Sequence, residues 1–159
     1  MASDIPTQKP PAPSIRVLAQ FARAVSFVTK DGVQVFGLKG TPNIDLGVDV
    51  GSDPVQGQEN VYETTLKLMA RAHVDNDTMF ELDLAYAGVF DVSGAPSDRV
   101  DSLLMVDCPN LLFPFARRMI ADISREGGFP PLLVDPIDFA GLYRQQLAER
   151  QAGSPPAGG

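Results

Sequence analysis

Cysteine and histidine are scarce in this sequence, and their scarcity removes several classes of function. Cys108 is the single cysteine, so no intrachain disulfide can form, and the chain fits a reducing compartment. His73 is the single histidine, and no Gly-x-Ser-x-Gly elbow accompanies it, which argues against a nucleophilic triad. We therefore expect a protein that is not an enzyme.

Long apolar runs and clustered basic residues are also missing. No run of about 18 apolar residues occurs, and the opening MASDIPTQKPPAPS lacks the layout of an export signal. The chain has 13 Lys and Arg against 20 Asp and Glu, a net charge of -7, whereas phosphate binding requires clustered basic side chains. We expect a cytoplasmic protein that neither binds nucleic acid nor inserts into a membrane.

Motifs for metals and nucleotides are incomplete. His73, Asp75 and Asp77 give an H-x-D-x-D pattern, but no glycine and distal glutamate complete a calcium loop. A solvated strand end followed by an Asx turn explains these three residues better. The segment GLKGTP does not match the Gly-x-x-x-x-Gly-Lys pattern of a phosphate loop. We expect no metal and no cofactor.

The chain does contain enough apolar sequence for one folded domain. It has 159 residues, of which 44% are hydrophobic, a composition typical of globular proteins rather than disordered ones. Residues 1–13 and 150–159 are rich in proline and small residues, which bury too little surface to offset the entropy of ordering. We predict disordered tails at these two ends, flanking a domain over residues 14–149.

Period-two alternation in the first half predicts an antiparallel sheet. The clearest strand runs from Val61 to Val74, with these residues on one face: Leu66, Leu68, Ala70, Ala72 and Val74. A turn over residues 75–77 leads to a second strand with these apolar positions: Phe80, Leu82, Leu84, Tyr86 and Phe90. We predict a hairpin, preceded by strands over residues 15–28 and about 44–50. Three acids near the latter are interpreted as a solvated face rather than as catalytic pairs: Asp45, Asp49 and Asp53.

Spacing of three and four residues in the second half predicts helices. Ser97 is a suitable N-cap for the first helix. The second helix ends at Gly127-Gly128 and has these apolar positions: Leu112, Phe115, Ala116, Met119, Ile120 and Ile123. A last helix begins near Asp138. Strands followed by helices indicate an α+β fold, with helices on one face of an antiparallel sheet.

An apolar segment with three prolines, GGFPPLLVDPIDFAGLY, joins the last two helices. Pro130, Pro131 and Pro136 exclude a helix or a central strand, so the segment is an extended connector. Its apolar side chains are costly to leave in water, at about 25 cal/mol per Å² of apolar surface. Either the connector lies on a core, or its side chains bind another molecule.

The stretch CPNLLFPFARRMIADISREGGFPPLLVDPIDFAGLY, Cys108 to Tyr143, resembles the signature region of SecB, a family of tetrameric export chaperones of proteobacteria. VSFVTKDGVQVF, NVYETTLKL and GVFDVSG precede it in the family's order, so the resemblance covers about residues 14–148. It implies a sheet of four antiparallel strands with helices on one face. It also implies dimers whose sheets join, and a homotetramer in which two dimers pack through the first long helix.

The resemblance implies an apolar groove that holds unfolded precursor proteins. Its candidates come from the long helix, the connector and the crossover segment between the first two strands: Pro42, Ile44, Phe113, Phe115, Phe129, Leu132 and Leu133. For Phe115, its spacing fits the core face of the helix equally well. Gly40 stands where relatives often have a tryptophan, which removes one aromatic wall.

A second implied site is an acidic patch on the open face of the sheet, which docks on the SecA motor ATPase. The candidates are Glu63, Glu81 and Asp83, which share one alternation class, with Asp83 the closest match to the family. The family's acidic positions in the first strand fall on Ala24 and Val28, and Glu81 replaces an apolar residue. The patch is therefore expected in altered form.

These features predict an ATP-independent chaperone that binds unfolded precursors in the cytoplasm, keeps them competent for translocation and delivers them to SecA. One alternative is a SecB-like chaperone dedicated to a single antitoxin or adaptor client, which differs only in the breadth of its binding. Another is a carrier of a small apolar ligand, for which the sequence offers no convergent set of polar groups.

Overall fold

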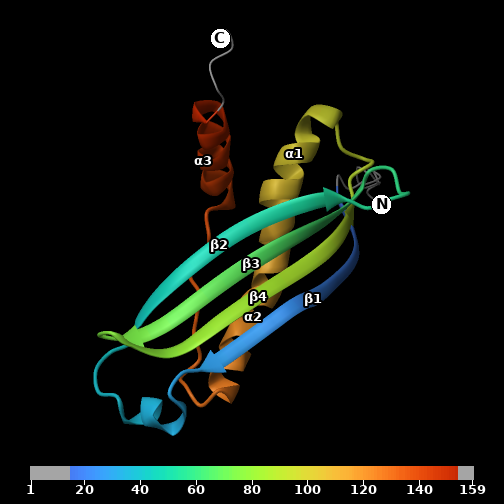
Figure 1. Ribbon diagram of the computed structural model, residues 1–159. Helices are drawn as coiled ribbons and strands as arrows, with labels where there is room; N and C mark the ends of the chain where they lie inside the picture. Colours follow the sequence, from blue (N-terminus) through green and yellow to red (C-terminus); the bar gives the residue numbers. More distant parts are fainter. Residues whose placement is uncertain (1–14, 154–159) are drawn as a thin grey trace, which may run out of the picture.

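The computed structural model describes residues 15–153 as one sheet with helices on one side (Figure 1). The four strands are β1 (Arg16–Thr29), β2 (Asn43–Pro54), β3 (Val61–Val74) and β4 (Asp77–Asp91). All neighbours are antiparallel, in the order β1-β4-β3-β2. The predicted α+β class and the predicted hairpin, β3–β4, are both confirmed.

Alternation along β3 and β4 separates a helix-covered face from an open face. Leu66, Leu68 and Leu82 face the helices and are completely buried. Lys67 and Asp83, on the other face, are exposed. Because directly paired residues of neighbouring strands point the same way, the register extends this division to β1 and β2.

A continuous helical path, rather than two separate helices, follows the sheet. It begins with a 3₁₀ turn, η2 (Ser97–Arg99), and continues through α1 (Val100–Ser102), a π turn, η3 (Leu103–Asp107), and α2 (Cys108–Glu126). The prediction of Ser97 as an N-cap is wrong, because Ser97 lies inside the first turn and Pro96 occupies the N-cap position. A π turn lies where the sequence predicts one helix to end and the next to begin.

The π turn and β3 together accommodate Pro109. The amide of Cys108 donates to the carbonyl of Leu103, five residues earlier. Pro109 has no N–H to offer the next carbonyl, that of Leu104. The buried Thr64 hydroxyl lies 3.4 Å from this oxygen and donates to it. The strand therefore supplies the donor that the proline lacks.

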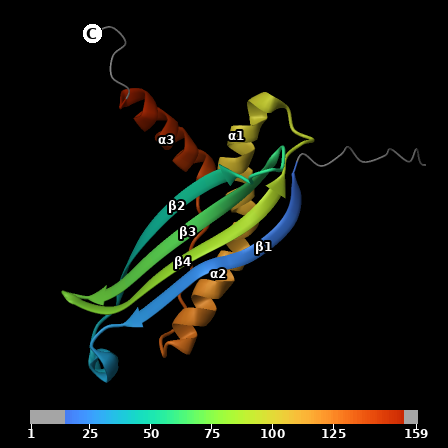
Figure 2. The same cartoon turned by 45° about the vertical axis from the view of Figure 1, so that its right-hand side comes forward.

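Helix α2 crosses the sheet (Figure 2). It packs there through a stripe of buried residues spaced four apart: Cys108, Leu112, Ala116, Ile120 and Ser124. Gly88 of β4 permits the close approach, because a Cβ there would lie 2.9 Å from the side chain of Leu112. Burial, with a smaller contribution from the charge of Asp107, raises the pKa of the Cys108 thiol to about 12. This cysteine is therefore a packing residue that is unreactive near neutral pH.

Helix α3 (Phe139–Ala152) extends away from the sheet (Figure 2). Asp138 caps it by accepting from the amide of Gly141 at 3.0 Å. Phe139 is buried at its base, and the Tyr143 hydroxyl donates to Asp101 at 2.5 Å, a bond that raises the pKa of Tyr143. The helix runs three residues into the segment predicted as the C-terminal tail. Residues 1–13 and the remainder of that tail from 154 lie outside the described residues.

Strand β1 is an edge strand with unusually exposed apolar side chains. The following residues are each at least 39% exposed: Val17, Leu18, Phe21, Val25 and Val28. They lie on both faces of the strand, since Val25 pairs with Leu84 of the covered face and Val28 with Glu81 of the open face. Separately, no helix within residues 15–153 has the length and apolar character needed to cross a membrane.

Candidate functional sites on the two faces of the sheet

The connector between α2 and α3 is fixed to α2 by one serine. The fully buried Ser124 hydroxyl donates to the carbonyl of Ile120 and accepts from the amide of Leu132, both at 2.8 Å. The carbonyl of Ser124 accepts from the amide of Phe129 at 3.1 Å. Ser124 was not among the predicted residues, although it is the polar member of the buried stripe on α2. It holds an extended segment that belongs to no helix or strand.

Four phenylalanines from distant parts of the chain meet beside the connector. The ring centroid of Phe129 lies 4.8 Å from Phe80, 5.2 Å from Phe36 and 6.3 Å from Phe27. Phe129 is 7% exposed, whereas Phe36 is 53% exposed. Phe36 lies in the 3₁₀ turn η1 (Gly32–Gly37) of the crossover, and the groove prediction omits it. The apolar residues of the run Val-Gln-Val-Phe could have indicated that Phe36 belongs to an apolar surface.

Gly127 and Gly128 make room for this cluster. A Cβ at Gly127 would overlap the ring of Phe27, and one at Gly128 would lie 3.0 Å from the ring of Phe36. Gly128 also has a φ of 92°, which L-residues rarely adopt. The glycine pair therefore ends the helix, as predicted, and also seats two aromatic rings.

A cavity of about 230 Å³, the apolar hollow, opens between the crossover and the connector. Its lining includes four of the groove candidates: Pro42, Ile44, Phe129 and Leu132. The other lining residues are Ala72, Met79, Phe80, Pro130 and Pro131, so no charged side chain borders it. Pockets that enclose small ligands measure about 300–1,000 Å³. The apolar hollow is smaller than this range.

The other three groove candidates lie outside the apolar hollow. Phe113 packs edge-on against Phe139, with centroids 6.2 Å apart, and is partly buried. Phe115 stacks on Tyr86 at 6.2 Å and is 50% exposed, so it does not belong to the buried stripe of α2. Leu133 is 65% exposed on the connector. Leu133 extends the apolar surface, while a groove role for the two phenylalanines stays a prediction.

Gly40 in the crossover has a backbone that disfavours the aromatic residue often found there in the family. Its φ is 121°, and a Cβ at this position would already lie 3.4 Å from Val74. A tryptophan at position 40 would require a different crossover backbone. The exposed ring of Phe36 is the nearest aromatic substitute that the crossover offers to Phe129.

The open face carries the three predicted docking acids, but they do not lie together. The β3–β4 register places Glu81 opposite Arg71 and Glu63 opposite Val89. Eight residues along β3 separate these two positions, about 26 Å at 3.3 Å per residue. Asp83 is two residues from Glu81 on β4. Only Glu81 and Asp83 therefore form a common patch.

Ion pairs distinguish the three acids further. Glu63 is paired with Arg23 at 2.8 Å, and Glu81 with Lys30 at 3.6 Å. Within residues 15–153, Asp83 is exposed and has no ion-pair partner. Asp83 is consequently the most available of the three carboxylates.

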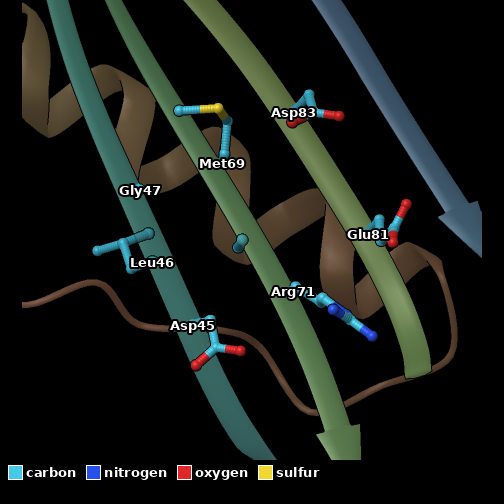
Figure 3. Close-up of a pocket in the computed structure, with 8 residues that line it drawn as sticks. Asp45, Leu46, Gly47, Met69, Arg71, Glu81 and Asp83 are labelled. Carbon is cyan, nitrogen blue, oxygen red and sulfur yellow. The ribbon is translucent and has the colours of Figure 1, made fainter. Parts of the chain in front are cut away.

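A shallow depression over β2, β3 and β4, the acidic hollow, includes Glu81 and Asp83 (Figure 3). Asp45 contributes a third carboxylate from β2, and Met69, 42% exposed, lies between the strands that carry the acids. Gly47 leaves space for this methionine, since a Cβ there would lie 3.1 Å from Met69 Cε. Asp45 was predicted to lie on a solvated face, but its proximity to the other two acids was not predicted.

His73 pairs with Asp45 at the edge of the acidic hollow. Its Nε2 lies 3.1 Å from the carboxylate of Asp45, and its Nδ1 lies 3.1 Å from the backbone carbonyl of Asp75. Among the described residues, no three His, Cys, Asp or Glu side chains converge on a common point. His73 therefore ties the end of β3 to β2.

Comparisons with known proteins agree on the family. The family model described as preprotein translocase subunit SecB matches residues 8–150. The protein-export protein SecB of Hyphomonas neptunium is 46% identical over 89% of this chain and 84% of that protein. The protein of the same name from Bradyrhizobium diazoefficiens is 41% identical over 96% of this chain and 94% of that protein. This chain belongs to the SecB family.

A solved structure shares the fold. It is the SecB-like chaperone of Mycobacterium tuberculosis, in complex with a peptide from an antitoxin. The TM-score is 0.63 at 12% sequence identity, over 78% of this chain and 91% of that one. At this identity the likeness concerns the arrangement of the sheet and helices.

Proposed function

We propose that this protein is an ATP-independent chaperone for export, which holds unfolded precursor proteins in the cytoplasm and delivers them to the SecA motor. The observation that carries the proposal is the apolar hollow of a SecB-family chain, continued by the exposed Leu133 and Phe36. Unfolded chains expose apolar side chains that folded proteins bury, so such a surface selects them. No catalytic group or cofactor is required.

Weak contacts at one hollow suffice if several hollows act on one client. Each hollow accommodates only a few side chains, but a long chain that reaches several hollows binds with a high effective concentration. We propose a homotetramer, a dimer of dimers, for this reason. The exposed apolar side chains of the edge strand β1 and of Phe115 on α2 support it, because both are surfaces that assembly would cover.

Docking on SecA is proposed for the acidic hollow on the open face. A net charge of -7 and the unpaired Asp83 favour a basic partner and accelerate its approach. Clients and motor would then bind to opposite faces of the sheet. A client could remain bound while the chaperone docks.

General export is favoured over service to a single client. The relatives named protein-export protein SecB are 46% and 41% identical to this chain, whereas the SecB-like chaperone bound to an antitoxin peptide is 12% identical. Breadth of binding is the property that separates the two functions. Several unrelated unfolded precursors should therefore compete for the same hollows.

The test is light-scattering mass after size exclusion, with the purified chain mixed with a precursor diluted from denaturant. We expect a tetramer-sized particle that co-elutes with the precursor and releases it as the precursor folds. A folded form of the same precursor is the control and should elute separately. If the chain elutes alone while the precursor aggregates, the holdase proposal fails.

A further inference from the structure

Glu81 in the acidic hollow lies between two cations of its own chain. Lys30, directly after β1, approaches it to 3.6 Å. Arg71 is its direct cross-strand partner on β3 and lines the same hollow. Asp83, two residues further along β4, has neither an ion pair nor a side-chain hydrogen bond within residues 15–153. Two carboxylates of one hollow thus differ in how far their charge is already compensated.

Arg71 is held in position rather than free to move aside. Its Nε and Nη2 donate to the hydroxyl of Thr78 on β4 at 3.1 and 2.7 Å. An arginine remains charged at any physiological pH. The hollow therefore has a permanent positive charge among its acids, fixed there by a neighbouring strand.

We propose that Lys30 and Arg71 weaken docking of a basic partner on the acidic hollow, because they compete with it for Glu81. A lysine or arginine of the partner that approaches Glu81 meets a carboxylate already paired with Lys30, whereas Asp83 has no ion-pair partner within residues 15–153, although Lys67 lines a neighbouring hollow with it. Asp83 consequently provides most of the attraction. The inference rests on the proposed function, in which SecA docks on this face.

The experiment is a titration of SecA against the full chaperone at low salt, with Lys30→Gln and Arg71→Gln, each alone and combined with Glu81→Gln. Each single substitution should tighten docking about two- to fivefold, the range of exposed charge pairs. In the Glu81→Gln background the gain should fall to less than half, since the competition acts through that carboxylate. Lys30→Gln leaves the hairpin untouched, so it tests the proposal even if Arg71→Gln does not fold.

Arg99→Gln is the matched control, because it removes one positive charge from an exposed residue beyond the opposite end of β4. It should leave docking unchanged. Equal tightening by all three substitutions, or an undiminished gain in the Glu81→Gln background, would indicate a general charge effect and overturn the inference.

Asp83→Asn separates this inference from the proposed docking face. If Asp83→Asn weakens docking while neither Lys30→Gln nor Arg71→Gln strengthens it, the face is correct and the competition is not. If Asp83→Asn has no effect, SecA docks elsewhere and the proposed face itself fails. Tightening by both cation variants together with weakening by Asp83→Asn supports both proposals.

Discussion

The two hollows lie back to back on one stretch of the sheet, yet they are built differently. Consecutive residues of β3, Arg71 and Ala72, line the acidic and the apolar hollow respectively. The apolar hollow is completed by two segments outside the sheet, the crossover and the connector, and no charged group borders it. The acidic hollow is formed by three paired strands, which fix each charge in register.

The difference fits the interactions that we propose for each surface. Apolar contacts are non-directional, so a surface made of extended segments can receive many unrelated side chains. Charge recognition depends on position and sign, so it benefits from strands that hold the charges at set spacings. A surface for varied clients and a surface for one partner can thus share a single sheet.

The largest effect is expected from Phe129→Ala, which should show whether the two surfaces are separable. Removing a buried ring that contacts three other phenylalanines should lower the free energy of unfolding by about 3–5 kcal/mol, measured by urea titration. Client binding should be lost, while docking of the folded fraction on SecA should persist. Equal loss of both activities in folded protein would contradict the separation.

A smaller effect is expected from Ser124→Ala, which removes the hydroxyl that ties the connector to α2. It leaves the amide of Leu132 without its partner, so stability should fall by about 1–3 kcal/mol and client affinity should fall with it. The matched control is Ser102→Ala, whose exposed hydroxyl bonds only the carbonyl of Arg99. That substitution should change stability by less than about 0.5 kcal/mol. If the Ser124→Ala variant bound clients with unchanged affinity, the hydrogen bond between Ser124 and Leu132 would not be needed to position the connector for binding.

Salt should act on the two surfaces unequally. Raising ionic strength from about 0.05 to about 0.5 M shortens the screening length from roughly 14 to 4 Å. SecA docking should weaken about tenfold, since it depends on exposed charges, and client binding should change less than about twofold. Isothermal titration at both salt concentrations measures both. Equal salt dependence would contradict the division between an apolar and a charged surface.

The smallest change is expected from Leu133→Ala, which should affect binding without affecting the fold. Because the side chain is 65% exposed, the free energy of unfolding should move by less than about 0.5 kcal/mol. Client affinity should fall about threefold if Leu133 touches the client. Leu147→Ala, which removes the same side chain from a partly exposed site on α3, is the control. Equal affinities of the two variants for a client would remove Leu133 from the binding surface.

The sequence predicts which face of the sheet a residue occupies more readily than where along the strand it lies. Alternation places Glu63 and Glu81 on one face, and the structure agrees. The distance between them depends on the register of β3 and β4. That register could have been predicted by counting residues outward from the turn that joins the two strands after Val74. Two acids on the same face of a sheet therefore need not lie close enough to form one patch.

Polar groups that complete the fold are harder to predict. The Thr64 hydroxyl donates to the carbonyl of Leu104, and the Ser124 hydroxyl accepts from the amide of Leu132. These groups are far apart in the sequence or belong to different elements, so they meet only when the elements pack together. The apolar hollow joins Ile44 and Phe129, residues far apart in sequence, and its prediction depended on family resemblance rather than on periodicity. Local pattern determines elements, whereas contacts between distant segments depend on how those elements pack.

The three prolines of the connector have a consequence for aggregation. Pro130, Pro131 and Pro136 carry no N–H, so the connector cannot pair edge to edge with an extended client as a strand does. Nucleation of cross-β fibrils requires a template with a regular row of backbone donors and acceptors. If clients bind here as we propose, the connector can contact their side chains but cannot act as a template for fibrils of the client.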